Sequence, residues 1–527
     1  MCQIQFDKPE STKMDDNWEN ARSALNDDRN NAQALGGKDA LKTLARRGKL
    51  TARQRIEQLL DPGTFQEIGQ LVRGKYRDIE GKKHEVAADA VVTGWGEING
   101  QQVMLVADDG SVMGGAGSTL NVEKRFRLRT MAIEAGCPFI GLYEGSAIRF
   151  QDSMDAGQMA RIPAFKEVID CAGKVPQVAA VMGPCYGRPP LDVLYADFSV
   201  QVEKTGFLGL SGPALVAGGI GEDVEMDVLS GTRMHVDRTG IVDRAAANEA
   251  SCLELIRTFL RFVPASAWAR GAPPIPDPRP CPELTELVPS NLRKPYDMSK
   301  VLDVVMDPTP RFAYKPTFGR SVLTELGLMG GGVVGVVASQ PQHKGGVMDA
   351  DACLKVRRFV AVCDAFHIPL LFLQDQPGFM IGKQAEEERI LLWAGALLGC
   401  VQRATVPKVT VVLRKCHGAA AWSMGGQNVG GNIVAAWPIA IMTGTGPASA
   451  VNTIHARELS SSDAPAQRRS ELEARYAASG SALLAARTFG IDEVIDPAET
   501  RTFVTRCFAM QLAGSREPVS PKVPLFP

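Results

Sequence analysis

The chain reads Val175-Pro176-x-Val178-x-x-Val181-x-x-x-Cys185-x-Gly187, and 231 residues later it reads Val406-Pro407-x-Val409-x-x-Val412-x-x-x-Cys416-x-Gly418. The same offset relates further pairs of residues: Pro138 and Pro369, Glu144 and Asp375, Gly114-Gly115 and Gly345-Gly346, and Lys124 and Lys355. A constant offset that holds over several blocks indicates that one domain has been duplicated. The period is too long for a solenoid of short repeats, so the sequence predicts a tandem pair of domains.

Each copy predicts the same order of elements around this motif. Apolar runs of strand length alternate with stretches of helical length, and a Gly-Gly loop follows the first run. The predicted strands are 103–107, 139–143 and 178–182 in the first copy and 333–338, 370–374 and 409–413 in the second, and the predicted helices are 121–135 and 352–366. This alternation favours an α/β fold with parallel strands and right-handed crossovers. Ligands of such sheets bind beyond the carboxyl ends of the strands, so we expect the chemistry in the loops that follow them.

Proline and charge mark the expected domain boundaries. Residues 270–281 contain five prolines in twelve residues, which predicts an extended connector. We therefore expect a polar N-terminal arm over residues 1–35, a first domain over 36–285 and a second domain over 286–527.

Composition excludes several classes of protein. The 527 residues carry a formal net charge of −1, which gives no overall field to recruit nucleic acid or an anionic membrane. The 11 cysteines include no Cys-x-x-Cys pair, so neither a zinc ribbon nor a disulfide framework is expected, and we expect no metal. No apolar stretch is long enough to cross a bilayer and the first residues have no signal-peptide core, so we expect a cytoplasmic protein.

Two loops of the second copy are suited to stabilise an oxyanion. Residues 375–382 leave a predicted strand through Gly378, and residues 414–422 contain Gly418, Ala419 and Ala420 where a helix is expected to begin. Backbone N–H groups at a helix start have no intrahelical partner and can bind a negatively charged oxygen. For either loop alone, a tight strand–helix packing joint explains the small residues equally well. Two such loops in one duplicated domain favour a functional role.

The sequence contains no conventional catalytic set. Gly-x-Ser-x-Gly, His-Glu-x-x-His and the phosphate-binding Gly-x-x-x-x-Gly-Lys-[Ser/Thr] are all absent. His417 is a candidate acid or base, or a ring that packs on an acyl chain, although a single histidine is more often structural. Trp393 is better explained as a core residue.

Several motifs together resemble the β subunits of biotin-dependent acyl-CoA carboxylases. They are residues 48–56 (GKLTARQRI), 59–65 (LLDPGTF), 375–379 (DQPGF) and 404–415 (ATVPKVTVVLRK), with Gly221, Gly231 and His235 to Gly240 falling as in that family. The resemblance extends from about Lys49 to about Asp496. It implies two tandem crotonase-like (ClpP/crotonase) α/β domains in a homo-oligomer, either a dimer or a hexamer formed as a trimer of dimers. It also implies an active site between the first domain of one subunit and the second domain of its partner.

The resemblance implies a mechanism that needs no catalytic triad. Carboxybiotin releases CO₂, the biotin ureido nitrogen removes the α-proton of a CoA thioester, and the enolate captures CO₂. The protein supplies N–H donors and positioning. Because the sequence has no biotin-attachment Met-Lys-Met, the carboxybiotin is expected on a separate biotin carboxylase/biotin carboxyl carrier subunit.

Carrying the motifs onto this chain gives two sets of candidate residues. The expected catalytic donors are Gly378, Phe379, Gly418, Ala419 and Ala420. The expected substrate-binding and CoA-binding residues are Gly114, Gly115, Gly145, Ser146, Ala147, Arg149, Gly187, Arg188, His417 and Trp422.

The first domain departs from the family pattern at its loops. The family usually has Asp-Ser-Gly-Gly-Ala-Arg where this chain has residues 144–149 (EGSAIR), and Cys-Ala-Gly-Gly-Ala where it has residues 185–189 (CYGRP). Pro189 has no N–H, and the Arg188 guanidinium is suited to grip a carboxylate or phosphate. Trp422 replaces a residue that is commonly Asp or aliphatic.

Three functions therefore stay open on the sequence. The first is a carboxyltransferase with a reshaped acyl-CoA pocket, which the well-kept second-domain motifs favour. The second is a biotin-independent acyl-CoA decarboxylase, hydrolase or isomerase, and the third is a catalytically silent structural subunit paired with an active paralogue.

Overall fold

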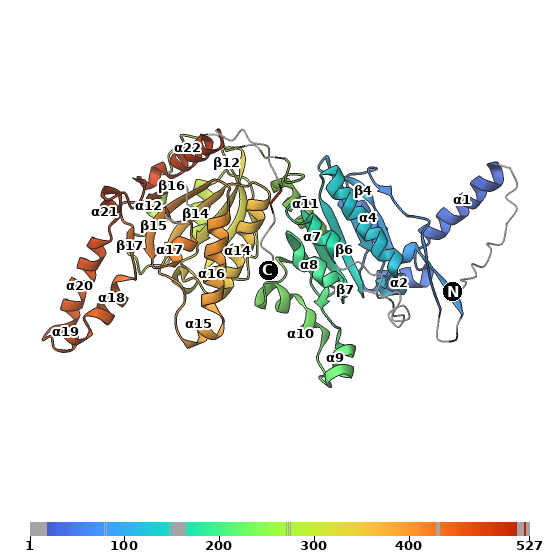
Figure 1. The fold of residues 1–527 in the computed structure, drawn as a ribbon, viewed down its shortest axis with the longest axis horizontal. Helices are drawn as coiled ribbons and strands as arrows, with labels where there is room; N and C mark the ends of the chain where they lie inside the picture. The colour runs from blue at the N-terminus through green and yellow to red at the C-terminus, as the bar shows by residue number, and fades with distance from the viewer. Residues whose placement is uncertain are drawn as a thin grey trace, which may run out of the picture.

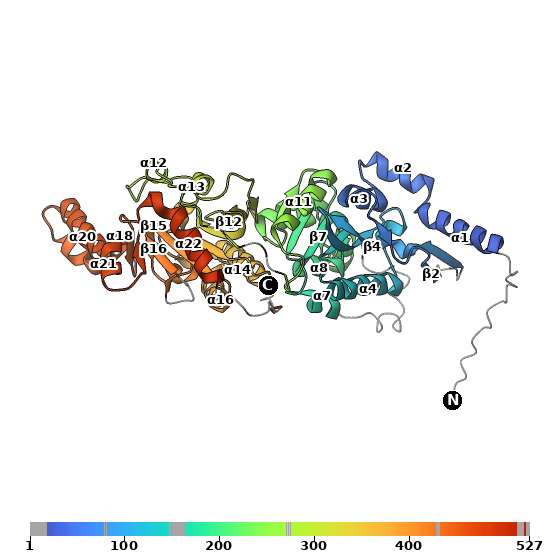
Figure 2. The same cartoon turned by 90° about the horizontal axis from the view of Figure 1, so that it is seen from above.

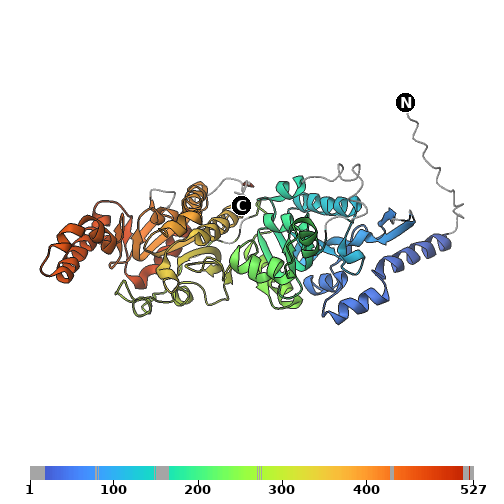
Figure 3. The same ribbon diagram turned by 90° about the horizontal axis from the view of Figure 1, so that it is seen from below.

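A computed structural model of the chain describes residues 18–77, 80, 82–146, 149, 165–269, 271, 273–274, 276–427, 433–513 and 521–522. Two mixed β-sheets flanked by helices lie side by side along the long axis of the molecule (Figure 1). We call the part built on the first sheet the N-half and the part built on the second sheet the C-half. Views from above and below show the same elongated arrangement (Figures 2 and 3).

The N-half contains nine α-helices and ten strands among its described residues. The helices are α1 (Trp18–Gln33), α2 (Lys38–Arg46), α3 (Ala52–Leu59), α4 (Thr119–Ala135), α7 (Lys166–Cys171), α8 (Pro189–Tyr195), α9 (Pro213–Ile220), α10 (Met226–Ser230) and α11 (Glu249–Phe262). The strands are β1 (Gln66–Glu67), β2 (Arg73–Arg77), β3 (Lys83–Ala87), β4 (Val91–Ile98), β5 (Gln101–Asp108), β6 (Phe139–Ser146), β7 (Gln177–Tyr186), β8 (Phe198–Val202), β9 (Phe207–Gly209) and β10 (Arg244–Ala246).

The C-half repeats this plan with additional helices at its end. Its helices are α12 (Leu284–Leu287), α13 (Met298–Val305), α14 (Ala350–Ala365), α15 (Lys383–Glu387), α16 (Ile390–Arg403), α17 (Ala420–Ser423), α18 (Pro447–Ile454), α19 (Ala456–Ser460), α20 (Pro465–Ser479), α21 (Ala482–Arg487) and α22 (Thr500–Ala513). Its strands are β11 (Phe312–Ala313), β12 (Val322–Met329), β13 (Gly332–Ser339), β14 (Leu370–Gln376), β15 (Lys408–His417), β16 (Ile433–Ala436), β17 (Ile441–Thr443) and β18 (Glu493–Val494).

The two sheets have the same topology. The strand order is β1-β4-β5-β6-β7-β8-β10 in the N-half and β11-β12-β13-β14-β15-β16-β18 in the C-half, and β9 and β17 each pair with the strand before the turn, β7 and β15. The duplication that the constant offset predicts is therefore present strand by strand. All six long predicted strands form, and the strands before the turns run further than predicted, to Tyr186 and His417.

The predicted strands pair parallel as expected, but each sheet has in addition an antiparallel edge that the sequence did not predict. β4 and β5 pair antiparallel, as do β12 and β13, whereas the strands from β5 to β8 and from β13 to β16 are parallel. Asn99-Gly100 and Gly330-Gly331 join the antiparallel strands, and all four have positive φ. A two-residue turn with positive φ closes a hairpin and leaves no room for a helical crossover. The parallel strands still place their carboxyl ends at one edge of each sheet.

A buried lysine occupies the same position in each half. Lys124 on α4 donates from Nζ to Ala88 O at 3.0 Å, and Lys355 on α14 donates to Phe318 O at 3.0 Å. Burial lowers the pKa of Lys124 to about 8 and the pKa of Lys355 to about 7. Each ammonium thus ties a long helix to the loop that leads into its sheet, which explains why this lysine recurs at the offset.

One apolar core connects the two halves. The rings of Phe198 and Phe259 from the N-half pack against Phe312 of the C-half, with centroids 5.1 and 5.7 Å from it. Lys315 Nζ lies 2.6 Å from Asp243 Oδ1 across the same junction. A shared core and a buried ion pair hold the halves as one body, although the described residues between 263 and 283 form no helix or strand.

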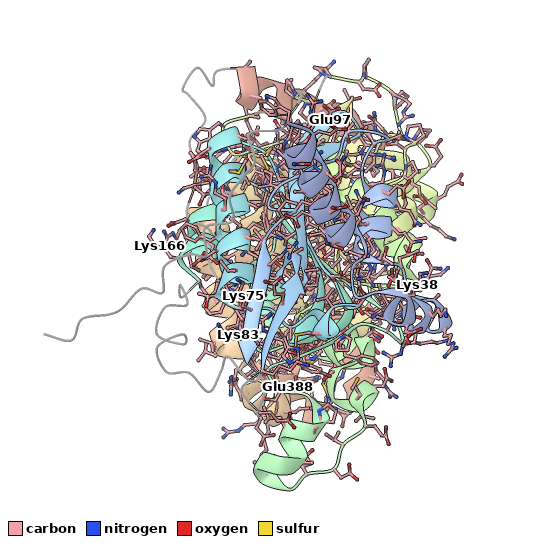
Figure 4. The ribbon with its side chains drawn as sticks, turned by 90° about the vertical axis from the view of Figure 1, so that its right-hand side faces the viewer. Lys38, Lys75, Lys83, Glu97, Lys166 and Glu388 are labelled. Atoms are coloured by element: carbon pink, nitrogen blue, oxygen red, sulfur yellow. The ribbon has the colours of Figure 1, made fainter. Side chains whose placement is uncertain are left out.

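Exposed lysines lie on the end of the molecule that carries α1. Lys166 and Lys38 lie toward opposite sides of this end, and Lys75 and Lys83 lie on the β2–β3 hairpin that faces the viewer (Figure 4). Among the described helices, none combines the length and the apolar character needed to cross a membrane.

Candidate oxyanion site at the strand ends

Two strand-end turns lie next to each other in the C-half. The first follows β14 and contains Gly378, and the second follows β15 and begins at Gly418. A Cβ added at Gly378 would lie 4.0 Å from His417 O, and Gln376 pairs with Cys416 in the sheet. Gly378 and Gly418 both have positive φ, 132° and 65°, so only glycine adopts these turns readily. The fold therefore brings the two predicted donor loops together.

The turn after β15 offers two free amides rather than three. The N–H of Gly418 donates to Thr443 O at 3.0 Å, which ties the turn to β17. This corrects the prediction that Gly418 is a donor to a ligand, because its hydrogen is already used. The N–H groups of Ala419 and Ala420 donate to no acceptor among the residues that the structure describes. Ala420 is the first residue of α17, where the helix cannot satisfy its own amides.

The turn after β14 leaves two further amides unused. Met348 N donates to Gly378 O at 3.1 Å and Met380 N donates to Met348 O at 2.8 Å. This bridge uses the carbonyl of Gly378 and the N–H of Met380, the residues on either side of Phe379. Within the described part of the chain, the N–H groups of Gly378 and Phe379 have no acceptor. Gly378, Phe379, Ala419 and Ala420 thus form the set of candidate donors in the C-half.

His417 is neutral and does not act as an acid at neutral pH. Its side chain is buried, and burial followed by the charge of Lys415 lowers its pKa to about 4. The hydroxyl of Thr443 donates to Thr445 O at 2.6 Å and lies 2.8 Å from His417 Nδ1. Because that hydroxyl has one proton, Nδ1 of His417 carries the proton of the second hydrogen bond. The ring of His417 therefore has a structural role and supports the turn after β15.

Trp422 stands beside the same turn on α17 and is 49% exposed. Its ring is therefore accessible from solvent, as a contact to a bound acyl or cofactor group requires. Trp393 packs against the core in part, in keeping with its expected structural role.

A buried carboxylate interrupts the sheet directly before each turn. The register between β14 and β15 shifts around Asp375, and the register between β6 and β7 shifts around Glu144. Asp375 accepts from Arg414 Nε at 2.8 Å and from the Lys415 amide at 3.2 Å. Bulges of this kind redirect the chain at functional sites, and here the paired carboxylate fixes the direction.

The Glu144 carboxylate is held by the N-terminal motif. Lys49 Nζ contacts Glu144 Oε1, and Arg55 Nη2 lies 2.5 Å from Glu144 Oε2 and 2.6 Å from Glu249 Oε1. All four side chains are buried, and burial lowers the pKa of Lys49. Sequence reasoning missed this role of Lys49 and Arg55. Their motif was visible, but its partner lies 95 residues away in the chain.

Close backbone packing accounts for two of the four predicted glycines of the N-half. A Cβ on Gly115 would lie 2.0 Å from Glu144 O, and a Cβ on Gly145 would lie 2.5 Å from Gly115 O. Gly114 has open space around it and a φ of 61°. Gly115 and Gly145 are therefore required by the approach of two loops, and Gly114 by its turn.

Three further predicted residues lie at or after the end of β6, and the structure places each of them differently. Ser146 ends β6 and pairs with Tyr186, while Ala147 lies outside the described residues. The side chain of Arg149 is fully buried, and its Nη1 lies 2.7 Å from Asp89 Oδ1. This corrects the expectation that Arg149 contacts the substrate, because the buried guanidinium is structural.

The turn after β7 has the backbone geometry of its C-half counterpart but different donors. Gly187 has a φ of 79°, and its N–H donates to Leu210 O at 3.2 Å, as Gly418 donates to Thr443 O. Arg188 and Pro189 follow, in the positions of Ala419 and Ala420. The N–H of Arg188 meets no acceptor in the described ranges, and Pro189 has none to offer.

The Arg188 side chain points into the protein. Its guanidinium binds Glu167, lies 3.6 Å from Asp192 Oδ2 and stacks 4.9 Å from the centre of the Phe165 ring. This corrects the expectation that the side chain grips an anionic acyl group, because two carboxylates already occupy it.

No group of three or more potential metal ligands occurs among the residues with described positions. The site offers a set of backbone N–H donors next to turns at which glycine lets a ligand approach the backbone closely. Such a set stabilises negative charge on a carbonyl oxygen and does not itself move a proton.

Comparison with known proteins agrees on one family. The carboxyl transferase domain family matches residues 44–525. The carboxyltransferase subunit of propionyl-CoA carboxylase from Haloferax mediterranei is 34% identical over 483 residues, covering 90% of this chain and 93% of that protein. Methylmalonyl-CoA decarboxylase subunit alpha from Veillonella parvula is 33% identical over 495 residues, covering 93% and 95%. Among solved structures, the hexameric transcarboxylase 12S with hydrolysed methylmalonyl-coenzyme A bound superposes with a TM-score of 0.89 at 31% identity, covering 98% of this chain and 100% of that one.

Proposed function

The chain belongs to the carboxyl transferase family, and on that premise we propose how its strand-end turns act on a CoA thioester. The protein is an acyl-CoA carboxyltransferase. Its chemistry places negative charge on the thioester oxygen when the α-carbon becomes an enolate. The free amides of Gly378, Phe379, Ala419 and Ala420 are the observation that supports a binding site for such an oxygen.

The free amides determine how much the site can accelerate the reaction. A preorganised N–H that meets the developing charge contributes about 10²–10³ in rate. The short approach that glycine permits at residues 378 and 418 lets a carbonyl reach these amides. The buried ion pair of Asp375 with Arg414 keeps the turn after β15 in place, so little reorganisation is needed during the reaction.

The proton must be taken by a group outside the described site. His417 has a pKa of about 4 and lies buried, so it is a poor base at neutral pH. Carboxybiotin supplies the carboxyl group and the base when it is bound. The ureido carbonyl of biotin suits the same kind of paired amide donors as a thioester carbonyl, which fits the presence of one turn in each half.

The partner that carries biotin and the assembly form the finer part of the proposal. We propose that a separate biotinylated subunit delivers the carboxyl group and that the chain assembles with further copies of itself. Exposed apolar side chains support self-association: Leu215 and Ile220 on α9, and Leu391 and Leu392 on α16. Apolar groups with 59–78% exposure are costly to leave in water and mark interaction surfaces.

A panel of CoA thioesters tests the proposal with the purified chain alone. The protein is incubated with malonyl-CoA, methylmalonyl-CoA and their uncarboxylated counterparts, with and without free biotin. The products are identified by mass spectrometry. We expect loss of the carboxyl group from a carboxylated thioester only when biotin is present. Conversion without biotin would identify a biotin-independent decarboxylase or hydrolase instead. If the chain converts no ester but binds an active paralogue, the chain is a silent subunit.

A further inference from the structure

Among the described residues, the turn after β7 has one available donor, and the turn after β15 has two. Gly187 N–H donates to Leu210 O just after β9, and Gly418 N–H donates to Thr443 O of β17. Arg188 therefore corresponds in position to Ala419, and Pro189 to Ala420. Pro189 therefore removes a donor that its counterpart keeps. The turn depends on the single N–H of Arg188, and that amide has to be well directed to have an effect.

A buried network of charges holds Arg188 from behind the turn. Glu167 on α7 and Asp192 on α8 both contact its guanidinium, and Arg129 lies 3.7 Å from Glu167 Oε1 and 3.0 Å from Asp192 Oδ2. The Tyr143 hydroxyl lies 3.2 Å from Asp192 Oδ2. Two carboxylates thus face two guanidinium groups. The Arg188 side chain is 12% exposed and the carboxylates 2% or less, so water screens these contacts little.

The Asp192 carboxylate of this network stays ionised at neutral pH. Although burial opposes ionisation of Asp192, the guanidinium groups of Arg129 and Arg188 hold the pKa of its carboxyl below its usual range. An ionised and buried carboxylate binds a planar guanidinium in a fixed geometry. The backbone of Arg188, with φ of −71° and ψ of −47°, is thereby fixed through its own side chain.

We propose that Arg188 is a positioning residue, whose side chain, clamped by Glu167 and Asp192, directs its own backbone N–H at the oxyanion bound in the N-half. The inference rests on the proposed function, since it needs a carboxyl-transfer reaction to act on. In this proposal the Arg188 side chain holds the backbone in place and does not bind the ligand. The side chain faces away from the ligand so that the amide faces toward it.

The test measures carboxyl transfer from methylmalonyl-CoA to free biotin. Wild-type transfer is established first, and if no CoA ester reacts the proposed function fails before the positioning role is examined. Arg188→Met keeps the N–H and most of the side-chain length but loses the clamp. We expect kcat to fall about 10-fold to 50-fold while KM for the CoA ester stays within about threefold. Arg188→Lys restores one charged contact and should recover part of kcat.

Two outcomes would overturn the proposal. Wild-type kcat in Arg188→Met would show that the clamp directs nothing, and a raised KM with unchanged kcat would show that the guanidinium binds substrate. Exposed Arg127→Met on α4 is the matched control and should leave both constants unchanged. If Arg188→Met does not fold, Glu167→Gln decides instead, because it weakens the clamp without changing the turn. A kcat in Glu167→Gln equal to that of the wild type would overturn the proposal in the same way.

Discussion

The N-half and the C-half share the backbone of their turns and differ in what the turns present. In both halves a glycine with positive φ follows the strand, and its N–H donates to a backbone carbonyl at the end of the short paired strand, Leu210 O just after β9 or Thr443 O of β17. The next two residues are Ala419 and Ala420 in one half and Arg188 and Pro189 in the other. Duplication has therefore kept the scaffold of the turn, which hydrogen bonding fixes, while the donors have diverged.

The halves also differ in how they hold the carboxylate before the turn. Asp375 is paired with Arg414 and Lys415 from the neighbouring strand, whereas Glu144 is paired with Lys49 and Arg55 from the N-terminal segment. The carboxylate before the turn is therefore paired with residues of the adjacent strand in the C-half and with residues of the distant N-terminal segment in the N-half. The N-half carboxylate depends on the docking of α3, whereas the C-half carboxylate is paired with residues of the adjacent strand β15.

Copying the N-half residue into the C-half should have the largest effect. Ala420→Pro removes one amide donor while α17 still begins at a position that tolerates proline, as Pro189 does at the start of α8. We expect kcat for carboxyl transfer to fall about 10²–10³-fold with little change in unfolding free energy. Ala421→Ser, which keeps every amide, is the control. A kcat within a few-fold of the wild type would show that Ala420 N–H meets no oxyanion.

Breaking the clamp on Glu144 should have the next largest effect. Lys49→Met leaves a buried carboxylate with Arg55 alone, and the unfolding free energy should fall by about 3 kcal/mol. The counterpart Lys415→Met removes a more distant contact, 3.4 Å from Asp375, and should cost about 1 kcal/mol. Denaturant unfolding of both variants measures the difference. Equal losses would contradict the view that the N-half depends more on its distant cation.

Part of the pH dependence of stability should come from His417 at the C-half turn. The pKa of His417 is about 4 in the folded protein and about 6.5 when unfolded, so the unfolded chain binds more protons between these values. Stability from this residue is present above pH 6.5 and is lost as pH falls toward 4, by about 2–3 kcal/mol. His417→Gln should flatten the pH profile of unfolding in that window. Tyr186, the N-half counterpart, does not titrate there, so Tyr186→Phe should leave the slope unchanged.

Restoring the missing donor in the N-half should have the smallest effect. Pro189→Ala adds an N–H at the position of Ala420, and we expect kcat to rise about 10-fold, less than a fully aligned donor gives. Removal of proline should lower stability by about 0.5 kcal/mol through the unfolded state. Steady-state kinetics beside thermal unfolding separate the two effects. A kcat that falls would mean that the proline shapes the turn more than the donor would assist it.

The sequence alone determined the architecture. The constant offset located the three central parallel strands of each sheet but not the long edge strands β4 and β12. The strand–glycine–small-residue pattern placed both C-half turns, because strand periodicity and glycine conformations are local properties of the chain. The tertiary structure decided which amides are free. Gly418 and Ala419 look equally available in the sequence, but only pairing with β17 uses the first. It also turned Arg188 and Arg149 inward and brought Lys49 to Glu144, since ion pairs between segments far apart in the chain depend on the packing of the whole fold and leave no periodic signal in the sequence.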